Sequence, residues 1–326
     1  MKKNIAHQLY SLLTIAALLV LSSCTHKKNI DKKSLYITPE PIESSSITEN
    51  PPPITIWIHG TVFFKKPPLF EQFHKTPTLI LASLLPEKGR FHRIADTIVQ
   101  QDQEHFSIDE FYIFCWSGHF SIRERKAAAE KLYTEIIALT QQYEEKYHQY
   151  PTIRIIAHSH GGNLALHMAK IKTVTSPLTI KSLILLACPV QEKTMHLIDT
   201  PMFQRIYSLY SSFDFVQILA PQLRRSDLTK QPYFAKASKD KQKKRSYKIP
   251  AFSSRLFPQH PHVIQAKIKV NNFPITHTRF ATTGFAEMLP KILYKLDSWD
   301  AADQKQHILH KYKLLCIYKK KNLKTT

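Results

Sequence analysis

Acidic residues and cysteines are both scarce in this sequence, and each shortage narrows what the protein can be. The 326 residues include 25 Asp and Glu against 46 Lys and Arg, so the formal net charge is +21. An excess of this size favours anionic partners such as acidic lipid, nucleic acid or polyanionic envelope polymers. The four cysteines do not indicate a disulfide-stapled scaffold. No internal repeat is visible, and a content of 43% hydrophobic and 22% charged residues is typical of a globular chain.

The sequence also lacks, near its start, an apolar run long enough to span a membrane comfortably. The apolar stretch Leu9–Val20 holds about a dozen residues, where a spanning helix needs about 20. It follows two lysines and precedes LSSC, an arrangement typical of a secretory signal. LSSC resembles the bacterial lipoprotein signal, which implies removal of residues 1–23 and lipidation of Cys24. An ordinary signal peptide or a short membrane anchor is the alternative.

Lipidation would leave an odd number of cysteines in the mature chain, so no complete set of disulfides is expected. Cys115 and Cys188 lie in apolar runs and are expected to be core thiols. Thr25 follows Cys24, whereas Asp at this place is associated with inner-membrane retention in typical diderm bacteria. The resemblance therefore implies a lipid-anchored protein of the bacterial cell envelope, with the outer membrane favoured.

Composition divides the rest of the chain into three parts, of which the second contains a basic insert. Residues 24–53 are rich in Pro, Ser and Thr and are expected to form a polar tether. Residues 54–300 are expected to form the folded domain. Within it, residues 222–250 hold ten basic residues against two acidic ones and form a basic insert or lid. Residues 301–326 are expected to be a basic C-terminal tail.

Buried strands alternate with helical patterns along the domain. The sequence predicts six strands, in ITIWIHG, DEFYIFCWSG, Thr152–Ala157, IKSLILLACP, RIYSLYSSFD and HVIQAKIKVNNF. Helices are predicted over RFHRIADTIVQQ, in the long segment capped by Ser121, from Gly161, and in GFAEMLPKILYKL with a bend at Pro290. Residues 61–89 are expected to be irregular. This alternation predicts an α/β fold with a mostly parallel sheet and helices on both faces.

The stretch IRIIAHSHGGNLALHMA, which begins at Ile153, places a serine between two histidines where a strand turns into a helix. At such a tight turn the central residue is pushed into the open with strained dihedrals. The residues two before and two after it must be small, because the strand and helix backbones nearly touch. Ala157 and Gly161 meet this demand, so Ser159 fits the nucleophile elbow, whose usual form is Gly-x-Ser-x-Gly.

A serine hydroxyl needs a base to take its proton, and the base needs an acid to fix its tautomer. In this arrangement they follow in the order Ser, Asp or Glu, His. Asp214 comes just after the fifth predicted strand and His277 just after the sixth. Because the carboxyl ends of parallel strands meet at one edge of a sheet, we expect both side chains near Ser159.

Together these features resemble the α/β-hydrolase family, in particular its lipase- and esterase-like members. The segments that carry the resemblance are IWIHGT, FCWSG, RIIAHSHGGNLA, SSFDFV and ITHTRF, which cover roughly residues 54–296. The resemblance implies that Ser159 is the nucleophile, His277 the general base and Asp214 the orienting acid. The backbone N–H groups of His160 and Thr61 would form the oxyanion hole. The departure is Ala157, where the family pattern has Gly.

Other interpretations are open for the elbow residues. Ser159 could be an ordinary turn residue. His158 and His160 could bind a metal as a pair, although no cluster of carboxylates or cysteines accompanies them.

The acid and the base have rivals as well. Asp214 could simply cap a strand end, with Asp199 as the alternative acid. His277 could be structural, with His260 and His262 as alternative bases, although all three rivals precede the strands in question.

The sequence thus predicts a membrane-tethered serine hydrolase that cleaves an acyl ester, with lipid as the favoured substrate class and no need for a cofactor. A thioesterase, amidase or acyltransferase would use the same residues. A catalytically silent module that binds lipid or an envelope partner is the alternative of another class, as is an envelope-binding protein with a relic hydrolase domain. The insert 222–250 is either a solvated loop or an element that docks on anionic lipid. Nucleic acid is the weaker partner, because an exported protein rarely meets it.

Overall fold

The computed structural model describes residues 51–61, 76–171, 178–219, 253–306 and 313–317, with the backbone alone from residue 299 onward. All of them belong to one compact unit, Ile47–Thr326. The predicted signal peptide, Cys24, most of the tether and the basic insert 222–250 lie outside the described residues.

A mixed β-sheet forms the centre of the domain, and in the part of the chain described it has nine strands. Its order is β2-β3-β1-β4-β5-β6-β7-β8, and β9 pairs with β7. The strands β1 and β3 to β7 run parallel to their neighbours in this series, whereas β2 and β8 are antiparallel to theirs. All six predicted strands are confirmed, as β1 (Ile54–Ile58), β3 (Phe111–Cys115), β4 (Ile153–His158), β5 (Ser182–Leu186), β6 (Ile206–Tyr210) and β7 (Val263–Val270).

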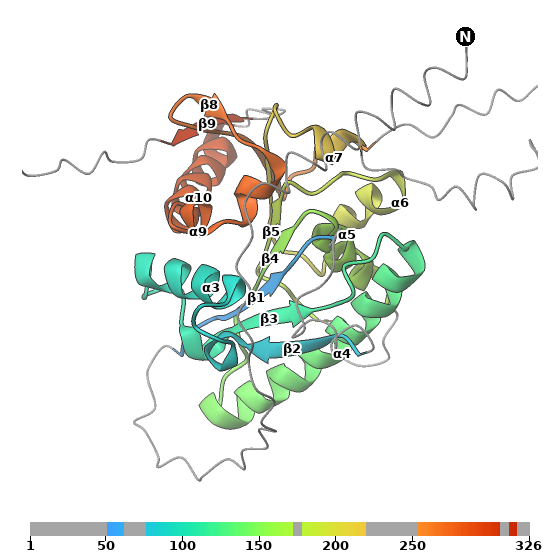
Figure 1. The fold of residues 1–326 in the computed structure, drawn as a ribbon, viewed down its shortest axis with the longest axis vertical. Helices are drawn as coiled ribbons and strands as arrows, with labels where there is room; N and C mark the ends of the chain where they lie inside the picture. The colour runs from blue at the N-terminus through green and yellow to red at the C-terminus, as the bar shows by residue number, and fades with distance from the viewer. Residues whose placement is uncertain (1–50, 62–75, 172–177, 220–252, 307–312, 318–326) are drawn as a thin grey trace, which may run out of the picture. The chain divides into compact units, whose positions relative to one another are not determined.

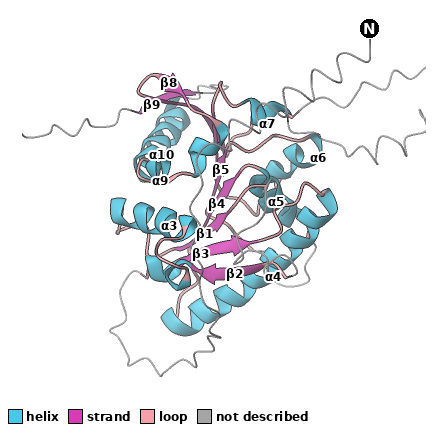
Figure 2. Cartoon of the chain, viewed as in Figure 1, coloured by secondary structure: helices cyan, strands magenta, loops and turns pink. Residues whose placement is uncertain are grey.

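Helices pack on both faces of the sheet, as the sequence predicts (Figures 1 and 2). One hydrophobic core joins the sheet to α4 (Ile122–Tyr147) and α5 (His160–His167). A second core joins the other face to α3 (Arg90–Gln101), α9 (Thr283–Ala286) and α10 (Leu289–Gln306). The Ser121 side chain accepts a hydrogen bond from the Glu124 N–H and so caps α4 as expected. The α/β class with a mostly parallel sheet is therefore what the structure has.

The expectation of irregular structure over residues 61–89 is wrong at its C-terminal end. Residues Thr78–Leu81 form β2, an edge strand antiparallel to β3, and Ala82–Leu84 form a short 3₁₀ helix. The Glu135 carboxylate on α4 accepts hydrogen bonds from the Leu79 N–H at 2.6 Å and from the Thr78 hydroxyl at 3.2 Å. A distant side chain therefore supports this four-residue strand, which a local pattern cannot reveal.

The C-terminal part also differs from the prediction. The expected bent helix is two helices, because α9 ends at Ala286 and α10 begins at Leu289. Pro290 does not bend a helix but lies in the first turn of α10, where a missing N–H costs nothing. The helix continues to Gln306, and β9 (Lys313–Ile317) lies within the predicted tail and adds a parallel strand to β7.

A tight hairpin after β7 reverses the chain, so that β8 pairs antiparallel with the end of β7. Asn271 and Asn272 both have positive φ, 51° and 67°, and connect β7 to β8 (Phe273–Pro274). Turns with two such residues match the twist of paired strands, and Asn tolerates them.

Among the helices of the described residues, none is both long and apolar enough to span a membrane.

Candidate active site

Ser159 lies in a single-residue turn between β4 and α5. Its backbone has φ 55° and ψ −131°, so a non-glycine residue occupies a strained region, as the elbow interpretation predicts. Its N–H donates to the carbonyl of Leu186 at the end of β5, at 2.8 Å. The turn is thus fixed to the neighbouring strand.

Glycines allow the elbow to pack against its surroundings. A Cβ atom on Gly161 would lie 2.6 Å from the carbonyl oxygen of His59 and 2.9 Å from that of Ile58. A Cβ atom on Gly60 would lie 2.7 Å from the Cβ of Ser159. The close approach predicted for Gly161 is therefore present, and it is made to the end of β1.

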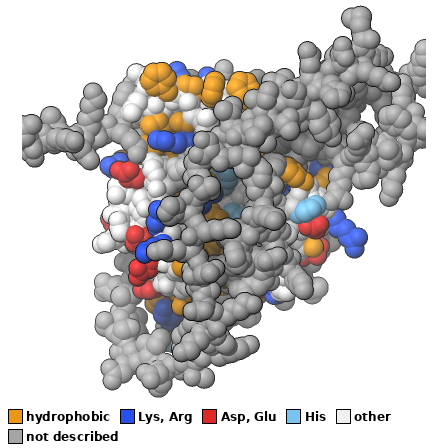
Figure 3. All heavy atoms as spheres, in the orientation of Figure 1, with side chains coloured by type: hydrophobic (Ala, Val, Ile, Leu, Met, Phe, Trp, Pro, Cys, Tyr) orange, Lys and Arg blue, Asp and Glu red, His pale blue; other side chains and the backbone are white. Residues whose placement is uncertain are grey.

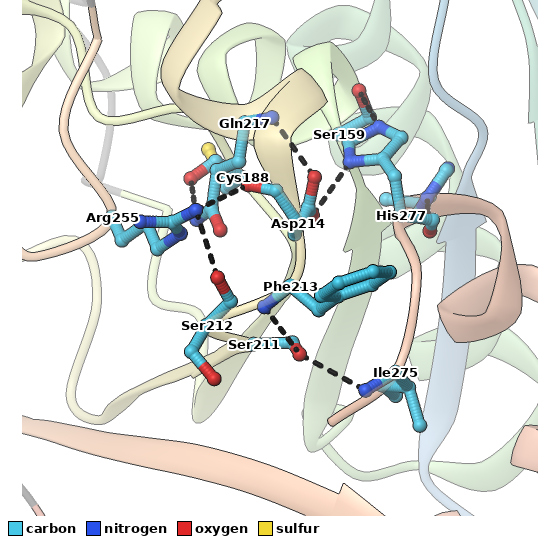
Figure 4. A network of polar contacts seen from close by, with 11 residues as sticks. Ser159, Cys188, Ser211, Ser212, Phe213, Asp214, Gln217, Arg255, Ile275 and His277 are labelled. Atoms are coloured by element: carbon cyan, nitrogen blue, oxygen red, sulfur yellow. Dashed lines mark hydrogen bonds and ion pairs between the residues drawn. The ribbon is translucent and has the colours of Figure 1, made fainter. Parts of the chain in front are cut away.

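Ser159, His277 and Asp214 form one hydrogen-bonded chain (Figure 4). The His277 Nε2 lies 2.8 Å from the Ser159 Oγ, and the His277 Nδ1 lies 2.8 Å from the Asp214 Oδ2. Because an ionised carboxylate only accepts, Nδ1 carries the proton and Nε2 is left to accept from the serine hydroxyl. All three side chains are buried. The structure brings together the three residues that the sequence selected.

Asp214 is held by groups that sequence reasoning did not identify. Its Oδ1 accepts from the backbone N–H of Gln217, at 2.9 Å, in the first turn of α7 (Phe215–Leu219). The Arg255 guanidinium donates to the carbonyl oxygens of Ser212 and Asp214, at 3.1 and 2.8 Å. No local motif marks Arg255, because its partners are backbone atoms about forty residues away.

The segments that carry the acid and the base are also linked directly to each other. The Ser211 hydroxyl oxygen accepts from the N–H of Ile275 at 3.0 Å and from the N–H of Phe213 at 3.3 Å. Ser211 follows β6, whereas Ile275 follows β8, two residues before His277. One side chain therefore fixes the spacing between the two loops (Figure 4).

The two residues expected to supply the oxyanion donors lie next to Ser159 in the chain or follow a residue that packs on it. His160 is the first residue of α5, a place where a backbone N–H has no acceptor within its helix. Thr61 follows Gly60, which packs on Ser159. His59, which precedes Gly60 in this loop, is held by Trp116, whose indole N–H donates to the His59 carbonyl at 2.8 Å.

Burial keeps the two histidines beside Ser159 neutral. It lowers the pKa of His158 well below its usual value, and the neighbouring His277 and Arg90 lower it further. Burial also lowers the pKa of His160, with Arg125 and His277 adding to the effect. Among the described residues, no group of three or more His, Cys, Asp or Glu side chains could hold a metal ion.

The rival residues have other partners. His260 Nε2 lies 3.3 Å from the Asp199 carboxylate, so the alternative acid and base pair with each other. His262 Nε2 contacts the carbonyl of Ile198 at 2.6 Å. Cys115 and Cys188 are buried free thiols, as expected, and burial raises the pKa of each to about 12. A thiol with such a pKa is a poor nucleophile at neutral pH.

The chain matches no protein-family model and no curated protein sequence.

Proposed function

We propose that the protein is a serine hydrolase of the α/β-hydrolase fold that cleaves a carboxylic ester through an acyl-enzyme. The observation that carries this proposal is the hydrogen-bonded chain from Ser159 through His277 to Asp214, with the serine at positive φ. A structural serine rarely needs both a strained backbone and an imidazole held by a buried carboxylate. This combination is the geometry that activates a hydroxyl as a nucleophile.

The reaction follows from the protonation states of the three side chains. Ser159 Oγ attacks the ester carbonyl while His277 Nε2 takes its proton, and Asp214 stabilises the imidazolium that forms. His277 then protonates the leaving alcohol, the ester C–O bond breaks, and water releases the acid from Ser159 by the same steps. The backbone N–H groups of His160 and Thr61 stabilise the tetrahedral oxyanion in this proposal.

The choice of a carboxylic ester as substrate is more specific than the geometry of the three side chains requires. A thioesterase, amidase or acyltransferase would need the same three residues, and the choice of an ester rests on the resemblance to lipases and esterases. A lipid-binding module that lacks activity is the alternative of another class. The complete acid–base chain supports the enzyme, because a binding module has no need of a polarised serine.

Labelling by a fluorophosphonate, which reacts with activated serines, tests the proposal. We expect one adduct on the wild-type protein by intact mass, none on Ser159→Ala and little on His277→Ala. The matched control is His260→Ala, which removes the imidazole of another Asp–His pair, that with Asp199, and is expected to label at the wild-type rate. An unlabelled but folded wild type would favour the binding module, and an adduct on Ser159→Ala would identify a different nucleophile.

We also propose that the enzyme works at an anionic membrane surface in the bacterial cell envelope, anchored through a lipidated Cys24. The segment 222–250 contributes ten basic residues against two acidic ones. In contrast, acidic and basic side chains are mixed along the edge of the molecule formed by α3 and α10 (Figure 3). Two exposed apolar side chains beside Asp214 also suit a membrane contact near the active site, since Phe213 and Phe215 are each 54% exposed. Exposed aromatic rings next to a basic segment are suited to insertion between anionic headgroups.

Flotation with phosphatidylglycerol-containing vesicles tests whether the protein binds an anionic membrane surface, on the chain that begins after Cys24. We expect binding that weakens with salt and with Phe215→Ser, because both the charge attraction and the buried apolar area contribute. Leu84→Ser is the control, because Leu84 is also exposed but lies on the short helix after β2. Equal binding to vesicles of phosphatidylcholine alone, or equal loss with Leu84→Ser, would contradict the proposal. Mass analysis of the mature N-terminus, with Cys24→Ala as control, tests the lipid anchor.

A further inference from the structure

The residue directly before Ser159 contacts the main chain of the base. His158 is the last residue of β4, and its Nε2 lies 3.1 Å from the backbone carbonyl oxygen of His277. The two imidazole rings also face each other at a tilt, with centroids 4.9 Å apart. Ser159 and the residue that touches the base are therefore consecutive at the end of one buried strand.

The protonation state of His158 follows from its surroundings. Its pKa is lowered well below the usual value, first by burial and then by the nearby His277, Arg90 and His59, and these effects outweigh the hydrogen bond to the His277 backbone, which raises it. A neutral imidazole has one N–H, and only a nitrogen with a proton can bind a carbonyl oxygen. Nε2 therefore donates to His277. Nδ1 is left as an acceptor on the side of Gly60, where a Cβ atom would come within 3.0 Å of it.

The turn that carries the base is bound at both ends. His277 begins the 3₁₀ helix η7 (His277–Ala281). The carbonyl at its start accepts from His158, and the carbonyl of Ala281 at its end accepts two hydrogen bonds from the Arg90 guanidinium, at 3.1 and 2.6 Å. The hydrogen bonds of the imidazole to Ser159 and Asp214 fix the ring, whereas these contacts fix the backbone from which the ring extends.

We propose that His158 is a positioning residue, which holds the main chain of His277 so that Nε2 stays within hydrogen-bond reach of Ser159. The proposal rests on the proposed function, because it gives the contact a purpose only if His277 is the base. Since His158 and Ser159 are consecutive residues at the end of β4, a movement of that end carries the nucleophile and the anchor of the base together. A displacement of about 1 Å between reacting groups can cost about 10²-fold in rate, which sets the scale of the expected effect.

Two substitutions separate the hydrogen bond from the packing of the ring. His158→Gln keeps an N–H donor at a similar distance from the backbone, whereas His158→Phe keeps a ring of similar size without a donor. We expect His158→Phe to slow fluorophosphonate labelling of Ser159 about 10- to 100-fold. His158→Gln should stay within about threefold of wild type. On an ester substrate the loss should fall on kcat, with KM little changed, because His158 does not contact substrate in this proposal.

His262 offers a matched control elsewhere in the chain. Its Nε2 also contacts a backbone carbonyl, that of Ile198, at 2.6 Å. His262→Phe removes the same kind of hydrogen bond and should lower the melting temperature while leaving the labelling rate unchanged. If it slows labelling as much as His158→Phe does, loss of stability explains the effect and the positioning role is refuted.

A spectroscopic measurement tests the contact without relying on activity. The proton between His277 Nδ1 and Asp214 is expected to give a downfield NMR signal that persists in His158→Gln and exchanges faster with water in His158→Phe. Unchanged exchange and unchanged labelling in a folded His158→Phe would overturn the proposal, as would a His158→Gln protein as slow as His158→Phe. If His158→Phe does not fold, a slow His158→Gln alone is enough to reject the role. A wild type that shows the signal but never labels would instead refute the proposed function.

Discussion

Close packing confines the turn at Ser159, whereas the loops that carry Asp214 and His277 are held mainly by hydrogen bonds, several of them from side chains of other segments. Around the serine, glycines let backbone approach backbone so closely that even one added carbon would overlap with its neighbours. Around the acid and the base, the contacts are made by groups such as Ser211, Arg255 and His158.

Because of this difference, substitutions at the Ser159 elbow and substitutions at the Asp214 and His277 loops should affect stability and activity differently. Atoms in steric contact cannot separate without moving the sheet, so a change at the elbow should disturb fold and activity together. A hydrogen bond can be removed while the backbone stays in place, so a change at the loops should lower activity more than stability. The predictions below test this distinction.

The largest effect is expected from Gly161→Ala. The new Cβ atom would meet the backbone oxygens of His59, directly after β1, and of Ile58, at the end of β1, at 2.6 and 2.9 Å, and backbone cannot rotate away. We expect a loss of about 3 kcal/mol or more in the free energy of unfolding, or no soluble protein, together with loss of labelling at Ser159. Urea unfolding and fluorophosphonate labelling measure the two effects.

Gly162→Ala provides the comparison for this change. Its Cβ atom would meet Cys188 Sγ and Leu185 Cδ2, which can rotate away, and Cys188 Cβ at 2.9 Å, which cannot, but no backbone oxygen. It should therefore destabilise the protein less than Gly161→Ala. Equal stability of the two variants would show that close packing against β1 does not hold the elbow.

Asp214→Asn should have the next largest effect, and it should separate activity from stability. The amide oxygen can still accept from the Gln217 N–H, so the start of α7 keeps its cap. The amide cannot orient His277 in the required tautomer, and in serine-protease triads the same change costs about 10⁴ in turnover. We expect labelling to slow by roughly 10³- to 10⁴-fold with little change in the urea midpoint.

Asp199→Asn is the control for this substitution, because Asp199 pairs with His260. It should leave labelling unchanged. If Asp214→Asn labels at the wild-type rate, Asp214 does not orient the base, whatever its distance from His277.

The elbow could be predicted from the sequence because its constraints are local. A β-branched run, a serine and small residues at fixed spacing lie within one short segment, and the chain has only six glycines, of which three are at positions 60, 161 and 162. The six central strands were also predictable, since most of them are buried and are nearly continuous apolar runs. Strand β7 is the exception, because its sequence VIQAKIKV alternates between apolar and polar residues along a partly buried strand. Asp214 and His277 were selected by their position after strands, and the structure brings both to Ser159.

The elements that the sequence did not reveal depend on contacts between distant residues. Strand β2 has four residues and receives support from Glu135 of α4, and β9 lies in a lysine-rich segment whose composition alone is typical of a tail. Strand β8 had a usable signal, because Asn271 and Asn272 form a two-residue turn between apolar residues. Arg255 and His158 donate to backbone carbonyls. Every residue type has a backbone carbonyl, so the sequence does not show which residues are their partners.

The smallest of these effects concerns acid stability on the elbow side. His167 lies at the C-terminal end of α5, and burial, with Arg125 and Lys126 adding to it, lowers its pKa from 6.5 to about 3. The unfolded chain therefore binds this proton first as the pH falls. The stability linked to His167 is complete above pH 6.5 and is lost towards pH 3, by up to about 1.4 kcal/mol per pH unit.

The variant His167→Gln has no titrating group at this position, so its free energy of unfolding should fall less steeply between pH 6.5 and 4.5. The difference in slope should approach one bound proton, and urea unfolding at a series of pH values measures it. His105→Gln is the control, because the side chain of His105 is 57% exposed and pairs with Asp102. The buried neutral His158 and His160 should leave some acid sensitivity in both variants. Parallel curves for His167→Gln and wild type would mean that His167 takes up its proton in the folded state as readily as in the unfolded one, and that the packing of α5 is looser than the elbow requires.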